Sequence, residues 1–348
     1  MFRRFVPALA LLLFVLPGHA QGTQSAPPPG ADAAAPPSFE SAQQLAGRGR
    51  LDQAMAQLDL LAAQTPEPAG VERLRGLIFY QKENFSEAIT AFTKAAAQDP
   101  NDRESLEMHG VTLFRMGHVP EAIPFLEKAR AVVVSANIDP DYVLALCYAD
   151  VQRYDDSRHS FAAQFGFAPD SPQAYLLAGR LFLRRELREE AGVQAAKALV
   201  LDPSLPLAHE LLGEVALARG DVPGAIRELE AERKLNPLDP DLYDRLGDAY
   251  LRTGQYTQAQ QALNRAVLLK PSATGPFILL GETFLKMNQP IQALHYLDHA
   301  AHMDPSNYIT HNLMGQAYKA IGDRAAANRE FKTVVELQRQ VNPTPAGK

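Results

Sequence analysis

The sequence predicts an all-α solenoid in which short helix pairs of equal length stack one upon the next. One observation is a period of 34 residues, kept by five prolines: Pro169, Pro203, Pro237, Pro271 and Pro305. A second is a glycine ten residues after each of these prolines, and a third is an alanine 22 residues after each. A fixed period in this range is the signature of stacked supersecondary units.

The first twenty residues have the pattern of a secretory signal peptide. Arg3 and Arg4 form a basic start, residues 5–16 are an uncharged apolar run, and Gly18 and Ala20 place small residues at a cleavage site. The run is shorter than the about 20 residues that a membrane span needs. We therefore expect cleavage after Ala20 and no membrane span thereafter, with an uncleaved anchor as the alternative.

Residues 21–37 are rich in proline and alanine and lack the apolar side chains of a core. Such a segment is expected to be a flexible linker. We place the solenoid at residues 38–341 and expect residues 342–348 to be a disordered tail.

The period also extends upstream of the five strict units. Pro66 and Pro100 begin two more units that keep the glycine and alanine spacing, and Ala42 and Ala54 fit an earlier one. One extra residue enters near residues 134–137. The sequence therefore contains about nine repeats.

Each repeat is expected to form two helices. In residues 239–271, Tyr243, Leu246 and Tyr250 recur at helical spacing, Gly254 breaks the pattern where a turn is needed, and Pro271 ends the second helix. A glycine inside a helix costs about 0.5–1 kcal/mol. Its recurrence in seven repeats predicts a compensating close approach between the two helices of a pair.

The sixth repeat departs from this pattern. Glu232 stands where most other repeats have alanine. A long acidic side chain is expected to fit poorly at this position unless its carboxylate reaches water.

The motif Tyr243-x-x-Leu246-Gly247-x-x-Tyr250, followed by Ala259 and the later small and proline positions, resembles the tetratricopeptide repeat. This resemblance implies a right-handed superhelical solenoid of antiparallel helix pairs, whose first helices line a concave groove. It also implies a protein-interaction scaffold and no enzyme.

The resemblance further implies which residues line the groove, at fixed distances after each proline. In the N-terminal repeats these positions are mostly apolar: Leu77, Tyr80, Val111, Phe114 and Leu146. In the later repeats they are charged: Arg180, Arg184, Glu210, Glu214, Asp241, Asp244, Asp248 and Glu282. We expect an extended partner segment with apolar side chains toward one end and basic ones toward the other. The alternatives are aromatic residues that pack between repeats and acidic residues that form only a solvated face.

Composition and motifs argue against other kinds of function. The formal net charge of -6 disfavours nucleic-acid binding, and no phosphate-binding loop or hydrolase motif occurs. Cys147 is the single cysteine, so no intramolecular disulfide can form, and we expect it to be buried and inert. No cofactor is expected.

Two further hypotheses remain from the C-terminal repeats. His295, His299 and His302 share one helical stripe, which suggests a metal site or, more simply, a wet polar face. The last helix bears Phe331, Val334, Val335 and Leu337, which would favour a self-assembling array if uncovered. Our main expectation is a periplasmic or secreted, non-catalytic scaffold of the bacterial cell envelope that binds a protein or peptide partner.

Overall fold

The computed structural model describes residues 37–132 and 140–341. Within these ranges the chain forms eighteen helices and no strand, which is nine helix pairs. The predicted all-α architecture and the number of repeats are therefore confirmed. The signal peptide, nearly all of the linker, the insertion near residues 134–137 and the tail lie outside the described residues.

The chain divides into two compact units between Cys147 and Tyr148, within α7 (Pro140–Asp150). Cys147 is buried, as predicted. The helices of the N-terminal unit that precede α7 are α1 (Phe39–Gly47), α2 (Leu51–Ala62), α3 (Val71–Gln81), α4 (Phe85–Gln98), α5 (Arg103–Arg115) and α6 (Val119–Ala131).

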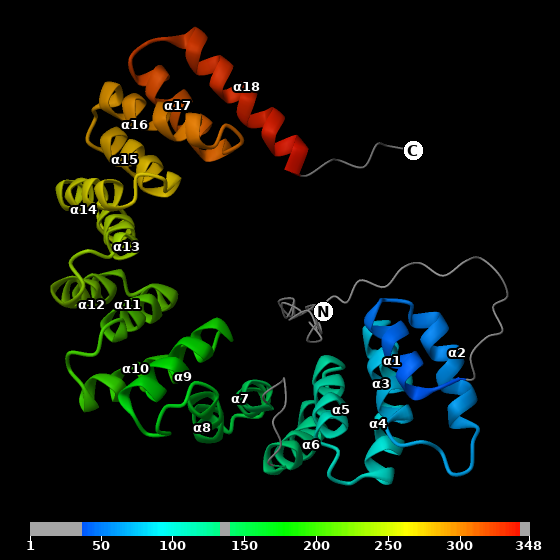
Figure 1. Cartoon of the computed structure of the whole chain (residues 1–348). Coiled ribbons are helices and arrows are strands. Elements are labelled where there is room, and N and C mark those ends of the chain that lie inside the picture. Colours follow the sequence, from blue (N-terminus) through cyan, green and yellow to red (C-terminus); the bar gives the residue numbers. More distant parts are fainter. Residues whose placement is uncertain (1–36, 133–139, 342–348) are drawn as a thin grey trace, which may run out of the picture. The chain divides into compact units, whose positions relative to one another are not determined.

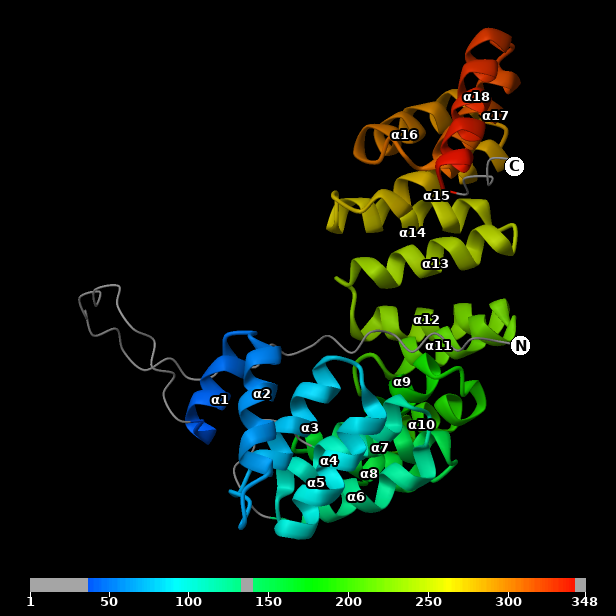
Figure 2. The same cartoon turned by 90° about the vertical axis from the view of Figure 1, so that its right-hand side faces the viewer.

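The C-terminal unit continues the succession of antiparallel pairs, and Figures 1 and 2 show its successive helices lying against one another. The helices that follow α7 are α8 (Tyr154–Gln164), α9 (Pro172–Arg184), α10 (Arg188–Leu201), α11 (Ala208–Arg219), α12 (Val222–Leu235), α13 (Pro240–Arg252), α14 (Tyr256–Leu269), α15 (Thr274–Lys286), α16 (Pro290–Met303), α17 (Tyr308–Ala320) and α18 (Arg324–Val341).

The recurring glycines lie where the two helices of a pair touch. A Cβ built on Gly110 would lie 2.5 Å from Cγ of Leu126, and one built on Gly213 would lie 2.8 Å from Cγ of Leu229. In both pairs the obstructing side chain comes 16 residues after the glycine. Any larger residue would force the helices apart, so the predicted close approach is confirmed.

The ends of α13 and α14 follow local sequence signals. The Asp239 carboxylate accepts hydrogen bonds from the backbone N–H groups of Asp241 and Leu242 at the start of α13. Gly254, with φ of 74°, makes the turn into α14, and α14 ends two residues before Pro271. The boundaries expected from residues 239–271 are therefore found.

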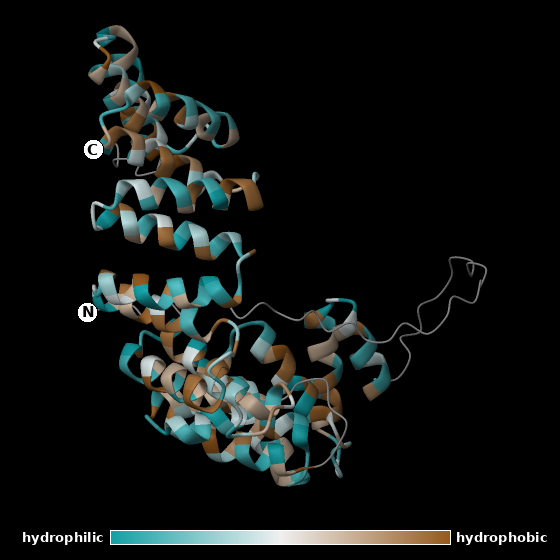
Figure 3. Ribbon diagram, turned by 90° about the vertical axis from the view of Figure 1, so that its left-hand side faces the viewer, coloured by the Kyte–Doolittle hydropathy of each residue, from teal (hydrophilic) through white to brown (hydrophobic). Residues whose placement is uncertain are grey.

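The core consists of many small apolar contacts. The recurring alanines are completely buried, as at Ala225, Ala259 and Ala293. Figure 3 shows apolar and polar residues alternating along the helices, as expected when each helix buries one face against its neighbours. None of the described helices is long and apolar enough to cross a membrane.

Candidate functional site

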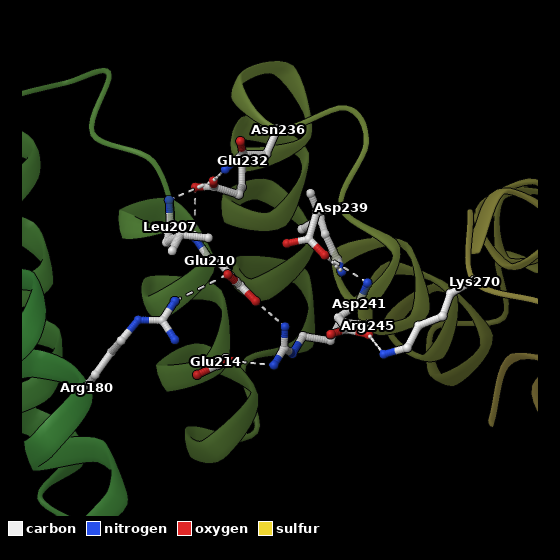
Figure 4. Close-up of polar contacts among 11 residues, drawn as sticks. Arg180, Leu207, Glu210, Glu214, Glu232, Asn236, Asp239, Asp241, Arg245 and Lys270 are labelled. Carbon is white, nitrogen blue, oxygen red and sulfur yellow. Dashed lines mark hydrogen bonds and ion pairs between the residues drawn. The ribbon is translucent and has the colours of Figure 1, made fainter. Parts of the chain in front are cut away.

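A network of ion pairs joins the first helices of three successive pairs in the C-terminal unit (Figure 4). Arg180 of α9 lies 3.4 Å from Glu210 of α11, measured from Nη2 to Oε2. Arg245 of α13 pairs with the other oxygen of Glu210 and lies 2.7 Å from Oε1 of Glu214. We call these residues, together with Asp241, Asp244, Asp248 and Lys270, the charged face.

Glu210 lies at the centre of this network and is almost fully buried. Burial raises the pKa of its carboxyl, and the guanidinium groups of Arg245 and Arg180 only partly offset that effect. Glu210 and Glu214 are nevertheless both paired with arginines of the same chain. These two acidic residues were predicted to line a partner-binding groove, and in the structure their ion pairs join α9, α11 and α13.

Sequence reasoning missed Arg245, because it lies between two of the expected groove positions. One signal would have found it. Arg245 follows Glu210 by 35 residues, one period plus one, which places a cation on the next first helix close to the acid.

The local position of α11 depends on Glu232, and here the sequence-based expectation was wrong. Glu232 is completely buried and does not reach water. Its carboxylate instead accepts hydrogen bonds from backbone N–H of Leu207 at 2.7 Å and Glu210 at 3.3 Å, and from Nδ2 of Asn236 at 2.5 Å. Leu207, the residue before α11, has φ of 69° and its side chain makes no capping hydrogen bond. Glu232 therefore caps the helix that bears Glu210 and Glu214.

The acidic residues of α13 differ in how their charges are compensated. Asp241 lies 3.2 Å from Nζ of Lys270, and Asp248 lies 3.6 Å from Nη1 of Arg252. Asp244 lies between them on the same helix. Its Oδ1 is buried, and no hydrogen-bond partner is found for it in the described ranges 37–132 and 140–341.

The surroundings of Asp244 favour its neutral form. Burial raises the pKa of its carboxyl, and the negative charges of Asp248 and Asp241 raise it further. A Cβ on Gly275 of α15 would lie 3.8 Å from Oδ2 of Asp244, so the neighbouring backbone leaves room beside this carboxyl. A donor from a second molecule would complete the hydrogen bonding of Asp244 and stabilise its charged form.

Two predicted groove residues lie outside the network. Arg184 of α9 is exposed and Glu282 of α15 is half-buried, and neither forms an ion pair with another part of the chain that the structure describes.

The apolar positions of the N-terminal unit are used for packing. Val111 and Leu146 are buried. Tyr80 lies 5.8 Å from the ring of Phe85, and the Arg115 guanidinium lies 5.4 Å from the centre of the Tyr80 ring. These contacts favour the alternative that aromatic residues here pack between repeats.

The histidine stripe is an exposed face of α16. The side chains of His295 and His299 are exposed, and a ring nitrogen of the exposed His302 is 2.7 Å from the Asp298 carbonyl oxygen. His299 lies beside Phe277, with 4.3 Å between ring centres. Over residues 37–132 and 140–341, no three histidine, cysteine or acidic side chains are grouped so that they could hold a metal ion.

In the part of the chain that the structure describes, nine successive helix pairs of similar length define an α-helical repeat protein. The family model for the tetratricopeptide repeat matches residues 39–103 and 210–276. A model described as anaphase-promoting complex, cyclosome, subunit 3 matches residues 81–163. The chain belongs to the tetratricopeptide-repeat family, and its fold class is the superhelical solenoid of helix pairs that defines that family.

Several solved structures are similar in fold. A MamA protein is 21% identical over 52% of this chain and 99% of its own, with a TM-score of 0.48. YrrB, described as a tetratricopeptide protein with an unusual peptide-binding site, is 21% identical over 52% of this chain and 93% of its own, with a TM-score of 0.48. The Cut9–Hcn1 hetero-tetramer of the anaphase-promoting complex is 17% identical over 80% of this chain and 54% of its own, with a TM-score of 0.43. No curated protein sequence matches the chain.

Proposed function

We propose that this protein is a non-catalytic scaffold that binds an extended segment of a protein partner on its charged face. The observation behind this proposal is Asp244, a carboxyl whose Oδ1 is buried without a hydrogen-bond partner among the described residues, between two other acids on one helix. Burying such a group costs about 1–3 kcal/mol unless a donor satisfies it. A lysine, an arginine or a backbone N–H of a bound segment would supply that donor.

The surrounding charges define the partner. Glu210 and Glu214 are already paired with Arg180 and Arg245. On α13, Asp241 and Asp248 pair with Lys270 and Arg252, and no ion pair is found for Asp244 among the described residues. The proposed partner therefore places a basic residue at Asp244 and Asp248. Membership of the tetratricopeptide family supports a scaffold function in general, and the signal-like N-terminal segment supports a place in the bacterial cell envelope.

The test measures the binding of fluorescent peptides to the protein. The peptides are extended segments that differ in their content of basic, apolar and acidic residues. We expect basic segments to bind and the double variant Asp244→Lys, Asp248→Lys to lose that binding. A matched double variant, Glu87→Lys with Glu121→Lys, changes the same charge at exposed positions of α4 and α6. If both double variants bind the peptides like the original protein, the charged face is not the binding site. Cell fractionation separately tests export.

A further inference from the structure

A second site is indicated by a cavity of about 350 Å³ in the C-terminal unit, which shares no residue with the charged face. Residues of α12, α13 and α14 line it. Tyr243, Leu246 and Ala262 supply a buried, largely apolar surface. The size is sufficient for a group as large as an amino acid.

The cavity lies where this repeat has a small side chain, Ala262. In the following repeat, Phe284 and Tyr296 take the places of Tyr250 and Ala262, 34 residues later, and their rings stack with 5.3 Å between centres. Ala262 cannot fill that space. The cavity is therefore encoded by a small side chain at a position where the next pair has a large aromatic one.

The polar lining of the cavity has an excess of positive charge. Each carboxylate oxygen of Glu230 already has a partner. Oε2 lies 2.5 Å from the Arg233 guanidinium, and Oε1 accepts a hydrogen bond from the Tyr250 hydroxyl at 2.7 Å. Arg265 is half-buried, and no ion pair or hydrogen bond joins its guanidinium to any residue that the structure describes. The remaining polar groups, Gln258 and Gln261, can also donate. One guanidinium is thus left without a counter-ion in a chain whose net charge is -6.

We propose that this cavity binds a carboxylate attached to an amino-acid-sized apolar or aromatic group, with Arg265 as its principal partner. A planar guanidinium matches a carboxylate in two parallel hydrogen bonds, and the apolar wall of Tyr243, Leu246 and Ala262 accommodates the rest of the ligand. The carboxylate belongs either to a free small molecule or to an acidic side chain of a peptide.

The experiment titrates the full chain with N-acetyl-phenylalanine while following the Nε–Hε NMR signal of Arg265, which is assigned by its loss in Arg265→Gln. Calorimetry gives the dissociation constant. We expect the Arg265 signal to shift, and the uncharged primary amide of the same compound to bind at least about tenfold more weakly. A blocked peptide with an internal Phe-Asp pair forms the second arm. Binding of the free acid assigns a small-molecule site, and binding of the peptide alone assigns a site for an acidic segment.

Two variants test the assignment independently. Arg265→Gln should weaken binding about tenfold, whereas Arg329→Gln, which removes an exposed arginine of α18, should leave it unchanged. Ala262→Tyr restores the aromatic residue of the next repeat and should fill the cavity, so binding should be lost while helicity is retained. The proposal is overturned if neither probe shifts the Arg265 signal, if the amide binds as well as the acid, or if Arg265→Gln binds like the original chain.

Discussion

The carboxylate of Glu232 accepts a hydrogen bond from the backbone N–H of Leu207 at 2.7 Å, although 25 residues separate them. Leu207 is the residue before α11, and Glu232 lies in the last turn of α12. The second helix of the sixth pair thus caps the first helix of the same pair. This contact fixes the start of the helix that bears Glu210 and Glu214.

Replacing Glu232 by alanine restores the residue that most other repeats have at this position, yet we expect it to destabilise the protein. The change removes a carboxylate that accepts three hydrogen bonds. The backbone N–H groups of Leu207 and Glu210 then lose this acceptor. The expected loss in the free energy of unfolding is about 2–3 kcal/mol. Chemical denaturation measures it, with Glu232→Gln as the variant that keeps one acceptor oxygen. An alanine variant more stable than the original chain would contradict the capping role.

Gly247→Ala should also destabilise the protein, although alanine is ordinarily preferred over glycine inside a helix. A Cβ at Gly247 would collide with the side chain of Leu263, which is completely buried. We expect overpacking to cost about 1–3 kcal/mol. Gly275→Ala is the matched control in α15, because its Cβ would meet only Asp244 at 3.8 Å, and it should gain up to about 1 kcal/mol. Thermal or chemical unfolding distinguishes the two, and similar effects at both positions would remove the packing explanation.

His109 should make stability depend on pH in mildly acidic solution. Its ring is buried and stacks on Phe125 with 3.9 Å between centres. Burial lowers the pKa of His109 from 6.5 to about 4. In the unfolded chain the imidazole of His109 is protonated below about pH 6.5, whereas in the folded chain it stays neutral down to about pH 4. The free energy of unfolding therefore falls as the pH drops from 6.5 to 4.

The full contribution of His109 over that window is about 3 kcal/mol. Unfolding free energies measured from pH 7 to 4 should fall more steeply for the original protein than for His109→Leu, which has no proton to bind at this position. Parallel curves for the two proteins would show that His109 does not cause the dependence.

The sequence predicted the fold well because the fold repeats. Proline, glycine and alanine each recur every 34 residues, so a local signal such as Gly254 or Pro271 was supported by its equivalents in other pairs. The contacts of the charged face were predicted less well. Periodicity places Glu210 on a first helix, but does not reveal that Arg180 and Arg245 approach it from both sides.

Individual departures from the repeat were the hardest to interpret. Glu232 was expected to need water because two of its three donors, the backbone N–H groups of Leu207 and Glu210, approach it only when α11 and α12 pack together. The third donor, Asn236, lies four residues later at the end of the same helix. The rings of His209 and His311 each place Nδ1 beside a carboxylate of the second helix of the same pair, that of Glu228 at 2.9 Å and that of Glu330 at 2.7 Å. Both acids follow their histidine by 19 residues, a spacing that would have predicted the contacts.

Asp244→Asn should stabilise the isolated protein at neutral pH while weakening partner binding. Burial and two neighbouring acids raise the pKa of the Asp244 carboxyl above its ordinary value of 3.8. The folded state therefore favours the protonated form, and this contribution to stability is present below pH 3.8 and lost as the pH rises through the folded pKa. At pH 7 the original protein retains an unfavourable charge that asparagine lacks.

We expect Asp244→Asn to raise the free energy of unfolding at pH 7 by on the order of 1 kcal/mol, with the gain shrinking toward pH 3. Asp241→Asn is the control, because Asp241 pairs with Lys270 at 3.2 Å and its loss should give no gain. A gain at Asp244 combined with weaker peptide binding would show that this carboxyl is maintained at the expense of stability for use by a partner. Destabilisation by Asp244→Asn would instead mean that the charge is already satisfied within the fold, and the proposed binding role would lose its main support.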